Sequence, residues 1–478
     1  MSNTAQLSAR ERITSLLDDN SFVEVGAFVT KRSTDFNLGQ KEVPNDGVIA
    51  GYGLIDGNPV YVFSQDSSSL GGSIGEMHAK KITQVYDLAL KVGAPVIGLI
   101  DSTGMRLEES TDALNSFGEI YQKQAMASGV IPQISAIFGN SGGGLAVMAS
   151  LSDFSFIGGD KARLFIQTPN SILGNNKEKL DTSSPAFNAE SGTVDYVGTS
   201  ELDVLNKIRE LVSILPSNNE DEGCVSQISD DMNRLVPEIE SKLEDTKQAI
   251  MDISDNNYFL ELKADYAKEM VIGFIRLNGI TVGAIANRTK VLDDNGKVKE
   301  QFESKLTTDG CIKATDFVRF CDAFDIPVLT LTNVSGYKAD IMEEKTIAKA
   351  SARLTYAFTD ATVPKVNLIV GKAFGSAYVS MNSKHIGADY VFALPNSEVG
   401  MMDAKLAAQI MYEGESDKVI NEKAKEYASL QNAGLSAAKR GYIDNIIEPE
   451  TVRKHLIYAF EMLFTKSEAR PLRKHGSF

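Results

Sequence analysis

The sequence predicts an α/β protein made of two tandem domains that arose by internal duplication. Three observations lead to this prediction. Apolar, strand-like runs alternate with helical patterns, a glycine-rich turn follows one of these runs, and the whole succession occurs twice. A length of 478 residues also favours two domains over one compact core. We expect these domains at residues 1–235 and 236–478.

The first half predicts a hairpin followed by parallel strands. The pair Asp56-Gly57 separates two alternating apolar runs, which is typical of a two-residue β-turn. Apolar strands then alternate with helical patterns, which indicates a mostly parallel sheet covered by helices. In order, the expected elements are a helix at 8–18, a strand at 22–25, the hairpin at 51–66, a helix at 74–92, a strand at 94–100, a helix near 110–127 and a strand at 134–138.

The turn after the last of these strands is the centre of the predicted site. It reads Gly139-Asn140-Ser141-Gly142-Gly143-Gly144 and leads into an apolar helix. Glycine lets the backbone approach a ligand closely, and the unpaired N–H groups at a helix start can face a negative charge.

The second half repeats these segments in the same order. The matched pairs are 51–66 with 273–288, 94–104 with 326–336, and 132–143 with 364–375. The last two pairs share one offset in numbering, since 326 minus 94 and 364 minus 132 both equal 232, so the helix between them has the same length in both copies. Two segments do not repeat: we expect an inter-domain linker with one or two helices at 215–260, and a charged excursion or hairpin at 291–308.

Ser141 suggests one possible chemistry, that of a serine hydrolase. It lies in the pattern G-x-S-x-G after a strand and before a helix, as a nucleophile elbow does. The second copy argues against a nucleophile, because Ala373 stands at the equivalent position while Gly139 and Gly143 recur as Gly371 and Gly375. The hydrolase stays a minor alternative.

Backbone chemistry is the favoured interpretation. Each turn would supply two N–H donors that stabilise an oxyanion, Gly143 and Gly144 in the first copy and Ser376 and Ala377 in the second. The competing interpretation is that the glycines only allow tight packing of helix against strand.

A loop at 101–106 ends the preceding strand, where open α/β sheets bind ligands. Within it, Arg106 would contact a phosphate, or else lie on the surface beside a helix start. His78, a lone histidine on a predicted helix, is better explained as structural, and Lys80-Lys81 beside it as a solvated face or a phosphate contact.

Composition narrows the function further. A net charge of −16 argues against nucleic acid as the main partner, while a CoA or nucleotide ligand stays possible. The three cysteines, Cys224, Cys311 and Cys321, lack metal-site or disulfide spacing and fit a reducing compartment. We find no signal-peptide core and no run of about 18 apolar residues, so a cytoplasmic protein without membrane insertion is expected.

Motifs along almost the whole chain resemble the biotin-dependent acyl-CoA carboxyltransferases, such as propionyl-CoA carboxylase β subunits and methylmalonyl-CoA decarboxylase α subunits. The motifs that carry this resemblance are Ala9–Ile13, Ser21–Glu24, Gly47-Val48, Phe63–Asp66, Gly71–Ser73, Ser128–Ser135, Phe317–Phe324, Ala361–Val366, Ser383–His385 and Arg470–His475.

The resemblance implies two crotonase-like domains and a homo-oligomer, a hexamer built as a trimer of dimers. The first turn would hold the thioester carbonyl of an acyl-CoA, and the second the ureido oxygen of biotin. Biotin would arrive on a separate carrier protein, with biotin carboxylase or membrane decarboxylase subunits as further partners. Residues expected to bind these two molecules are Asp101, Ser102, Gly104, Arg106, Gly336, Gly375 and Tyr378; no metal site is expected.

Three departures from the family pattern fall on the expected biotin side. Gly-Gly-Ala-Tyr reads Gly375-Ser376-Ala377-Tyr378, Pro-Gly-Phe reads Ser335-Gly336-Tyr337, and Arg-His-Gly reads Lys349-Ala350-Ser351. They motivate a second alternative, a scaffold subunit without catalysis. The sequence leaves open the acyl chain and the direction of carboxyl transfer.

Overall fold

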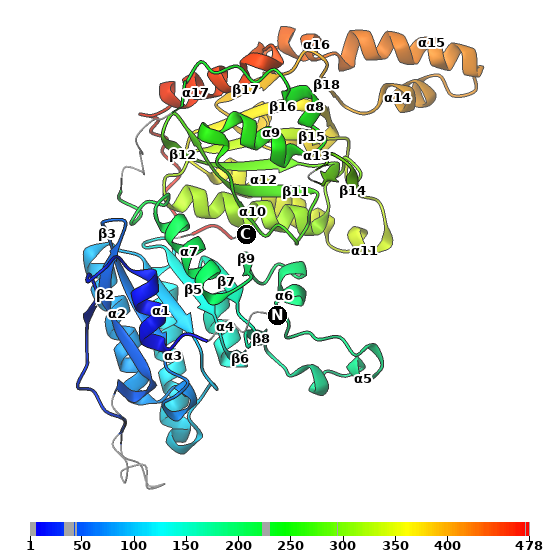
Figure 1. Cartoon of the computed structure of the whole chain (residues 1–478). Coiled ribbons are helices and arrows are strands. Elements are labelled where there is room, and N and C mark those ends of the chain that lie inside the picture. Colours follow the sequence, from blue (N-terminus) through cyan, green and yellow to red (C-terminus); the bar gives the residue numbers. More distant parts are fainter. Residues whose placement is uncertain are drawn as a thin grey trace. The chain divides into compact units, whose positions relative to one another are not determined.

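The computed structural model describes residues 6–32, 43, 45–221, 230–293, 295–473 and 475–477. Cys224, part of the expected linker, and Lys474 of the C-terminal motif lie outside them. The chain divides into two compact units, Met1–Cys224 and Val225–Phe478, where the sequence suggested 1–235 and 236–478. Each unit is described separately (Figure 1).

The first unit is built on a seven-stranded sheet. Its strand order is β1-β2-β3-β4-β5-β7-β9, with β1, β2 and β3 antiparallel and all later neighbours parallel. This confirms the hairpin and the mostly parallel sheet. The strands are β1 (Val23–Glu24), β2 (Val48–Ile55), β3 (Asn58–Gln65), β4 (Val96–Ile100), β5 (Gln133–Ile137), β7 (Phe154–Gly158) and β9 (Tyr196–Gly198).

Helices cover this sheet and close an apolar core. Every residue of β4 and β5 is buried, which is why these strands read as continuous apolar runs. Apolar residues of α2, such as Ile82 and Val85, share one core with Phe63 and Ile100 of the sheet. The helices are α1 (Ala9–Leu16), α2 (Glu76–Val92), α3 (Ser110–Ala127), α4 (Gly144–Ser150), α5 (Asn175–Glu178), α6 (Pro185–Glu190) and α7 (Glu201–Val212).

The second unit repeats this sheet. Its order is β10-β11-β12-β15-β16-β17-β19, again antiparallel up to β12 and parallel afterwards. These strands are β10 (Leu260–Leu262), β11 (Met270–Leu277), β12 (Ile280–Asn287), β15 (Val328–Val334), β16 (Lys365–Phe374), β17 (Tyr390–Ala393) and β19 (Asn445–Ile446). The agreement in order and direction shows that the sequence repeat is a repeat of structure.

The helices of the second unit follow the same plan, with two differences. The 18-residue α3 is matched by the separate helices α11, of four residues, and α12, of 14 residues, so the equal helix length expected from the constant offset is wrong. α14 and α15 extend away from the sheet as a two-helix arm (Figure 1). The segment expected as a linker carries α8 and α9, but Ile239 and Ile250 of these helices belong to the core of the second unit, so this part of it is not a linker. The helices are α8 (Ile239–Lys242), α9 (Thr246–Ile253), α10 (Thr308–Ala323), α11 (Ile341–Glu344), α12 (Ile347–Asp360), α13 (Gly375–Val379), α14 (Ala404–Met411), α15 (Asp417–Tyr427), α16 (Gly434–Lys439) and α17 (Val452–Met462).

The constant offset also relates single backbone contacts in the two copies. The isolated bridge of Ile74 with Met105 recurs as the bridge of Leu306 with Tyr337. The two hairpins, in contrast, begin at 51 and 273 and are separated by a smaller offset. The extra length of the second copy coincides with the hairpin β13 (Lys290–Leu292) and β14 (Val298–Gln301), which confirms a hairpin in the charged excursion.

A buried lysine also recurs at the constant offset. Lys81 on α2 donates to the Val48 carbonyl at 2.5 Å, and Lys313 on α10 donates to the Tyr266 carbonyl at 2.7 Å. Burial lowers the pKa of Lys81 to about 8 and that of Lys313 to about 7. Lys81 therefore holds the start of β2. It neither lies on a solvated face nor contacts a phosphate.

A small second pairing holds each glycine-rich turn. In the first unit β6 (Asn140–Gly142) pairs in parallel with β8 (Arg163–Phe165). In the second unit the end of β16 pairs in the same way with β18 (Glu398–Gly400). Each turn therefore leaves the main sheet along a short strand before its helix begins. Among the described residues, no helix combines the length and the apolar character needed to cross a membrane.

An equivalent aspartate in each unit gives a prediction on stability. Asp153 accepts the Gln133 N–H at 2.8 Å, and burial together with the charge of Asp195 raises its pKa to about 7. The folded state then keeps this proton up to about pH 7, while the unfolded state releases it near pH 4. The contribution of Asp153 to stability therefore falls as pH rises through this window. We expect Asp153→Asn to remove this fall and to raise the melting temperature at pH 7.5 by about 2–4 °C, as a change of about 1 kcal/mol would.

The control for this prediction is Asp389→Asn. Asp389 occupies the equivalent place in the second unit but forms an ion pair with Lys466 at 2.8 Å. This variant should melt at or below the wild-type temperature. Parallel melting curves of Asp153→Asn and wild type from pH 5.5 to 8 would contradict the assignment.

Candidate functional site

The first turn presents backbone amides at the start of α4. Gly143 caps this helix with φ +60° and ψ −123°, a conformation that residues other than glycine rarely adopt. Its N–H donates to the Phe165 carbonyl at 2.9 Å, across the pairing of β6 with β8. Within the described residues, the N–H groups of Gly144 and Leu145 have no acceptor. The donors offered by this turn are thus Gly144 and Leu145, in place of the expected Gly143 and Gly144.

The Gly144 carbonyl is fixed from outside the turn. Tyr121 on α3 donates its hydroxyl to this carbonyl at 2.6 Å. A Cβ on Gly144 would lie 3.0 Å from both Tyr121 Oη and Phe117 Cε1, so a larger residue would press on this aromatic pair. Because the Gly144 carbonyl and the Leu145 N–H belong to one peptide plane, Tyr121 also sets the direction of that N–H.

The second turn offers amides in the same register. Gly375 has φ +63°, and α13 begins one position earlier than α4 does in the repeat. No acceptor is present for the Ser376 and Ala377 N–H groups in the part of the chain that the structure describes. At the constant offset, these two residues correspond to Gly144 and Leu145, so the second pair of predicted donors lies where expected.

Asp101 lies at the end of β4, beside the glycine that opens the first turn. It is buried and accepts hydrogen bonds from Arg12 at 2.9 Å, Gln6 at 3.1 Å and Ser67 at 3.0 Å. A Cβ at Gly139 would lie 2.1 Å from its carboxylate, which explains the glycine that opens the turn. These contacts make Asp101 a structural support, unlike the ligand-binding role that the sequence suggested.

Arg106 is neither a phosphate ligand nor a surface residue. Its side chain is only 2% exposed and pairs with Asp46 at 2.6 Å and Glu109 at 2.7 Å. It also donates to the Ser73 carbonyl at 2.7 Å. With its charge neutralised inside the protein, the guanidinium ties the loop at 101–106 to the start of α2. Both sequence interpretations of Arg106 were therefore wrong.

The neighbouring candidates belong to the same support. Ser102 is buried and accepts the Gly104 N–H at 3.1 Å, and the Gly104 carbonyl accepts the Ile74 N–H at 2.8 Å. His78 is fully buried, with its ring nitrogens 2.9 Å from the Asp46 carbonyl and 3.2 Å from Gln65 Nε2. Burial and the nearby Arg106 lower the pKa of His78 to about 3, so it stays neutral and structural, as expected.

The remaining candidates surround the second turn. The Gly336 carbonyl accepts the Leu306 N–H at 2.9 Å. Tyr378 is 3% exposed, and burial raises the pKa of its hydroxyl, which has no hydrogen-bond partner in the described part of the chain. Its ring lies edge-on to His385, with the ring centres 5.9 Å apart. The binding role expected for Tyr378 stays a prediction.

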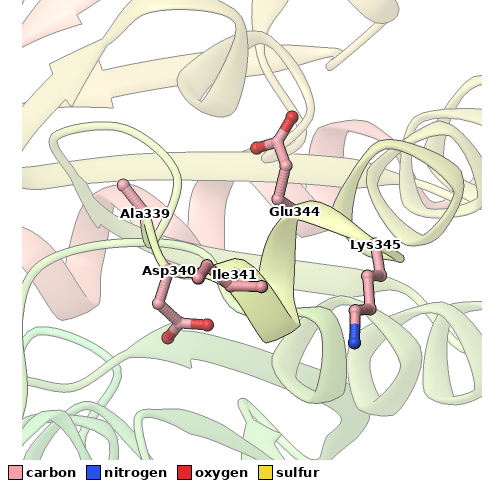
Figure 2. Close-up of a pocket in the computed structure, with 5 residues that line it drawn as sticks. All are labelled: Ala339, Asp340, Ile341, Glu344 and Lys345. Carbon is pink, nitrogen blue, oxygen red and sulfur yellow. The ribbon is translucent and has the colours of Figure 1, made fainter.

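An open hollow of about 550 Å³ adjoins the loop that holds Gly336. It is lined by Ala339, Asp340, Ile341, Glu344 and Lys345 around α11, with Glu344 and Lys345 pointing to opposite sides of that helix (Figure 2). No residue of either turn lines it. We therefore do not assign it to the chemistry of the turns.

Ser141 lacks the surroundings of a nucleophile. It is fully buried on β6, ahead of the helix start, and its hydroxyl has no partner among the described residues. His78, the histidine of this unit, is bonded elsewhere. Neither a base nor access for a substrate is present in the described part of the unit.

Replacing Ser141 by alanine is therefore expected to leave kcat of the reaction that the protein catalyses within about twofold of the wild-type value. Removal of a buried hydroxyl that has no partner does not break a hydrogen bond and relieves a desolvated polar group. The measurement is kcat of the purified variant beside wild type. A loss of 100-fold or more at unchanged melting temperature would restore the hydrolase.

Sequence reasoning missed Tyr121 and Leu145. Leu145 carried no signal, because a backbone donor needs no particular side chain. Tyr121 was one of several residues on a predicted helix, and only its contact with Gly144 reveals a role.

Two α/β units, each with a parallel sheet and a glycine turn that presents amides at a helix start, define a tandem crotonase-like protein. The Carboxyl transferase domain family matches residues 3–478, and the chain belongs to this family. It is 39% identical over 486 residues to the propionyl-CoA carboxylase beta chain of Roseobacter denitrificans, covering 99% of this chain and 93% of that protein. It is 38% identical over 492 residues to the methylmalonyl-CoA decarboxylase subunit alpha of Propionigenium modestum, with the same coverage.

A comparison with solved structures leads to the same family. A crystal structure of transcarboxylase 12S, described as a hexamer and solved with hydrolysed methylmalonyl-coenzyme A bound, superposes with a TM-score of 0.92. The match covers 99% of this chain and 93% of that one at 34% identity. The prediction of the family, drawn from the sequence motifs, is confirmed.

Proposed function

We propose that this chain is the carboxyltransferase subunit that moves a carboxyl group between biotin on a separate carrier protein and a short-chain acyl-CoA. The observation that carries the proposal is the pair of unbonded amides at the same register in both turns, at Gly144 and Leu145 and at Ser376 and Ala377. Membership in the carboxyltransferase family supports it. The relatives named after propionyl-CoA and methylmalonyl-CoA point to the substrate class.

The two turns would divide the reaction between them. The first would hold the thioester carbonyl of the acyl-CoA and stabilise the enolate that forms at its α-carbon. The second would hold the ureido oxygen of biotin, which supplies the group that carries the carboxyl when bound. Each preorganised donor of this kind contributes about 3–4 kcal/mol to a transition state. In this reaction, negative charge would develop on two oxygens, and the backbone N–H donors of the two turns would stabilise both. The buried Ser141 and His78 would have no part in it.

The assembly is a further part of the proposal. We expect a homo-hexamer, by analogy with the transcarboxylase 12S structure, together with a biotin carrier and a carboxylase or decarboxylase partner. Large apolar side chains on the surface of each unit support subunit contacts. The most exposed include Leu107, Leu173, Ile341, Met401 and Met462. A cytoplasmic location stays a prediction.

The scaffold alternative rests on the three departures on the biotin side, at Ser335–Tyr337, Lys349–Ser351 and Ser376. One assay separates the two: purified protein is incubated with methylmalonyl-CoA or malonyl-CoA and free biotin, and loss of the thioester's carboxylate is followed. Biotin-dependent turnover is the expected result. Intact CoA binding without turnover would favour the scaffold.

A further inference from the structure

Four hydroxyl side chains of the second unit form a hydrogen-bonded chain that ends on the backbone of α13. The Tyr337 hydroxyl lies 3.0 Å from Ser351 Oγ, which lies 3.2 Å from Ser380 Oγ. Ser380 donates to the Ser376 carbonyl at 3.1 Å, and Thr355 donates to Ser380 at 2.8 Å. We call Tyr337, Ser351, Thr355 and Ser380 the hydroxyl chain.

The hydroxyl chain contains two departures from the family pattern, Tyr337 and Ser351, and ends on the backbone carbonyl of a third, Ser376. Tyr337, Ser351 and Ser376 come from three separate segments, which the resemblance singled out as Phe, Gly and Gly in other members. The structure connects them through two buried hydroxyls, those of Ser351 and Ser380. Buried hydroxyls are costly unless they are bonded, so their pairing from the loop to the helix implies a selected arrangement.

In the first unit, one side chain is enough to reach the equivalent carbonyl. There Tyr121 donates directly to the carbonyl at the position equivalent to Ser376. The buried faces of α3 and α12 match two positions beyond the constant offset, so Phe117 and Tyr121 correspond to Ser351 and Thr355 of the hydroxyl chain. The second unit therefore has two small hydroxyl side chains where the first has an aromatic pair, and the side chain that donates to the equivalent carbonyl is that of Ser380.

We propose that Tyr337 is a positioning residue for the second turn, acting through Ser351 and Ser380. The Ser376 carbonyl shares a peptide plane with the Ala377 N–H, so a donor that holds the carbonyl also aims the N–H. The backbone of Tyr337 is itself anchored by its bridge to Leu306. The proposal rests on the proposed function, in which the Ala377 N–H stabilises the oxyanion bound at the second turn.

The test compares Tyr337→Phe and Ser351→Ala with wild type in the reaction of methylmalonyl-CoA with free biotin. Loss of one neutral hydrogen bond predicts a roughly three- to tenfold lower kcat, with the KM for the acyl-CoA unchanged. Ser351→Thr keeps the hydroxyl and should restore kcat. Hydrogen exchange of the amides at 378–381 should quicken by a similar factor in both damaging variants, and this readout needs no catalysis.

The matched control is Thr359→Ala, which removes an exposed hydroxyl that bonds within the same helix, to the Thr355 carbonyl. It should leave kcat and exchange unchanged. Exchange at wild-type rates in Tyr337→Phe and Ser351→Ala would overturn the positioning role, even if both variants melt earlier. An inactive wild type would instead refute the proposed function, and the exchange result would still decide whether the hydroxyl chain positions α13.

Discussion

Replacing Gly143 by valine is expected to lower kcat by about 100- to 1,000-fold while the protein stays folded. The φ of +60° with ψ of −123° is closed to a β-branched residue, so the turn must change its backbone to accept valine. A changed turn releases the N–H of Gly143 from the Phe165 carbonyl and redirects the amides of Gly144 and Leu145. Loss of one preorganised donor to an oxyanion has this effect on kcat.

Gly57→Val is the control for this experiment. Gly57 has φ +83° in the hairpin between β2 and β3, and no atom lies near a Cβ there, as is also true of Gly143. Both variants should lose stability, because valine is strained at a positive φ. Only the Gly143 variant should lose turnover of methylmalonyl-CoA with biotin. Equal activities in the two variants would show that the first turn has no part in the reaction.

Replacing Arg106 by methionine is expected to lower the free energy of unfolding by about 3–5 kcal/mol. Methionine matches much of the arginine volume but leaves Asp46 and Glu109 buried without their cation. Burial already raises the pKa of Asp46 while Arg106 is present. The measurement is unfolding in denaturant or by heat at pH 7.

Lys123→Met provides the comparison for Arg106. Lys123 pairs with Asp87 on the surface, where both side chains are about a third to a half exposed, and such a pair contributes about 0–1 kcal/mol. A phosphate-binding Arg106 would behave in the opposite way, with wild-type stability and a raised KM for acyl-CoA. That result would reverse the assignment made from the structure.

The repeat and the family could be read from the sequence because their signals are local. Asp56-Gly57 and Asn278-Gly279 take positive φ in both hairpins, as turn residues of this type do. The buried strands β4 and β5 are continuous apolar runs, and the constant offset fixed the order of the second unit before any coordinates. The second pair of amides, at Ser376 and Ala377, followed from the same register.

Only the tertiary structure decided which polar groups face each other. Arg106 meets Asp46 from a loop far earlier in the chain, and Asp101 meets Arg12 from α1, so both lose their predicted roles as ligands. The engaged N–H of Gly143 depends on the pairing of β6 with β8, and the hydroxyl chain joins three distant segments. Periodicity and turn chemistry fix local elements because they act between residues a few positions apart. Hydrogen bonds and ion pairs across the fold depend on distances that no local pattern encodes.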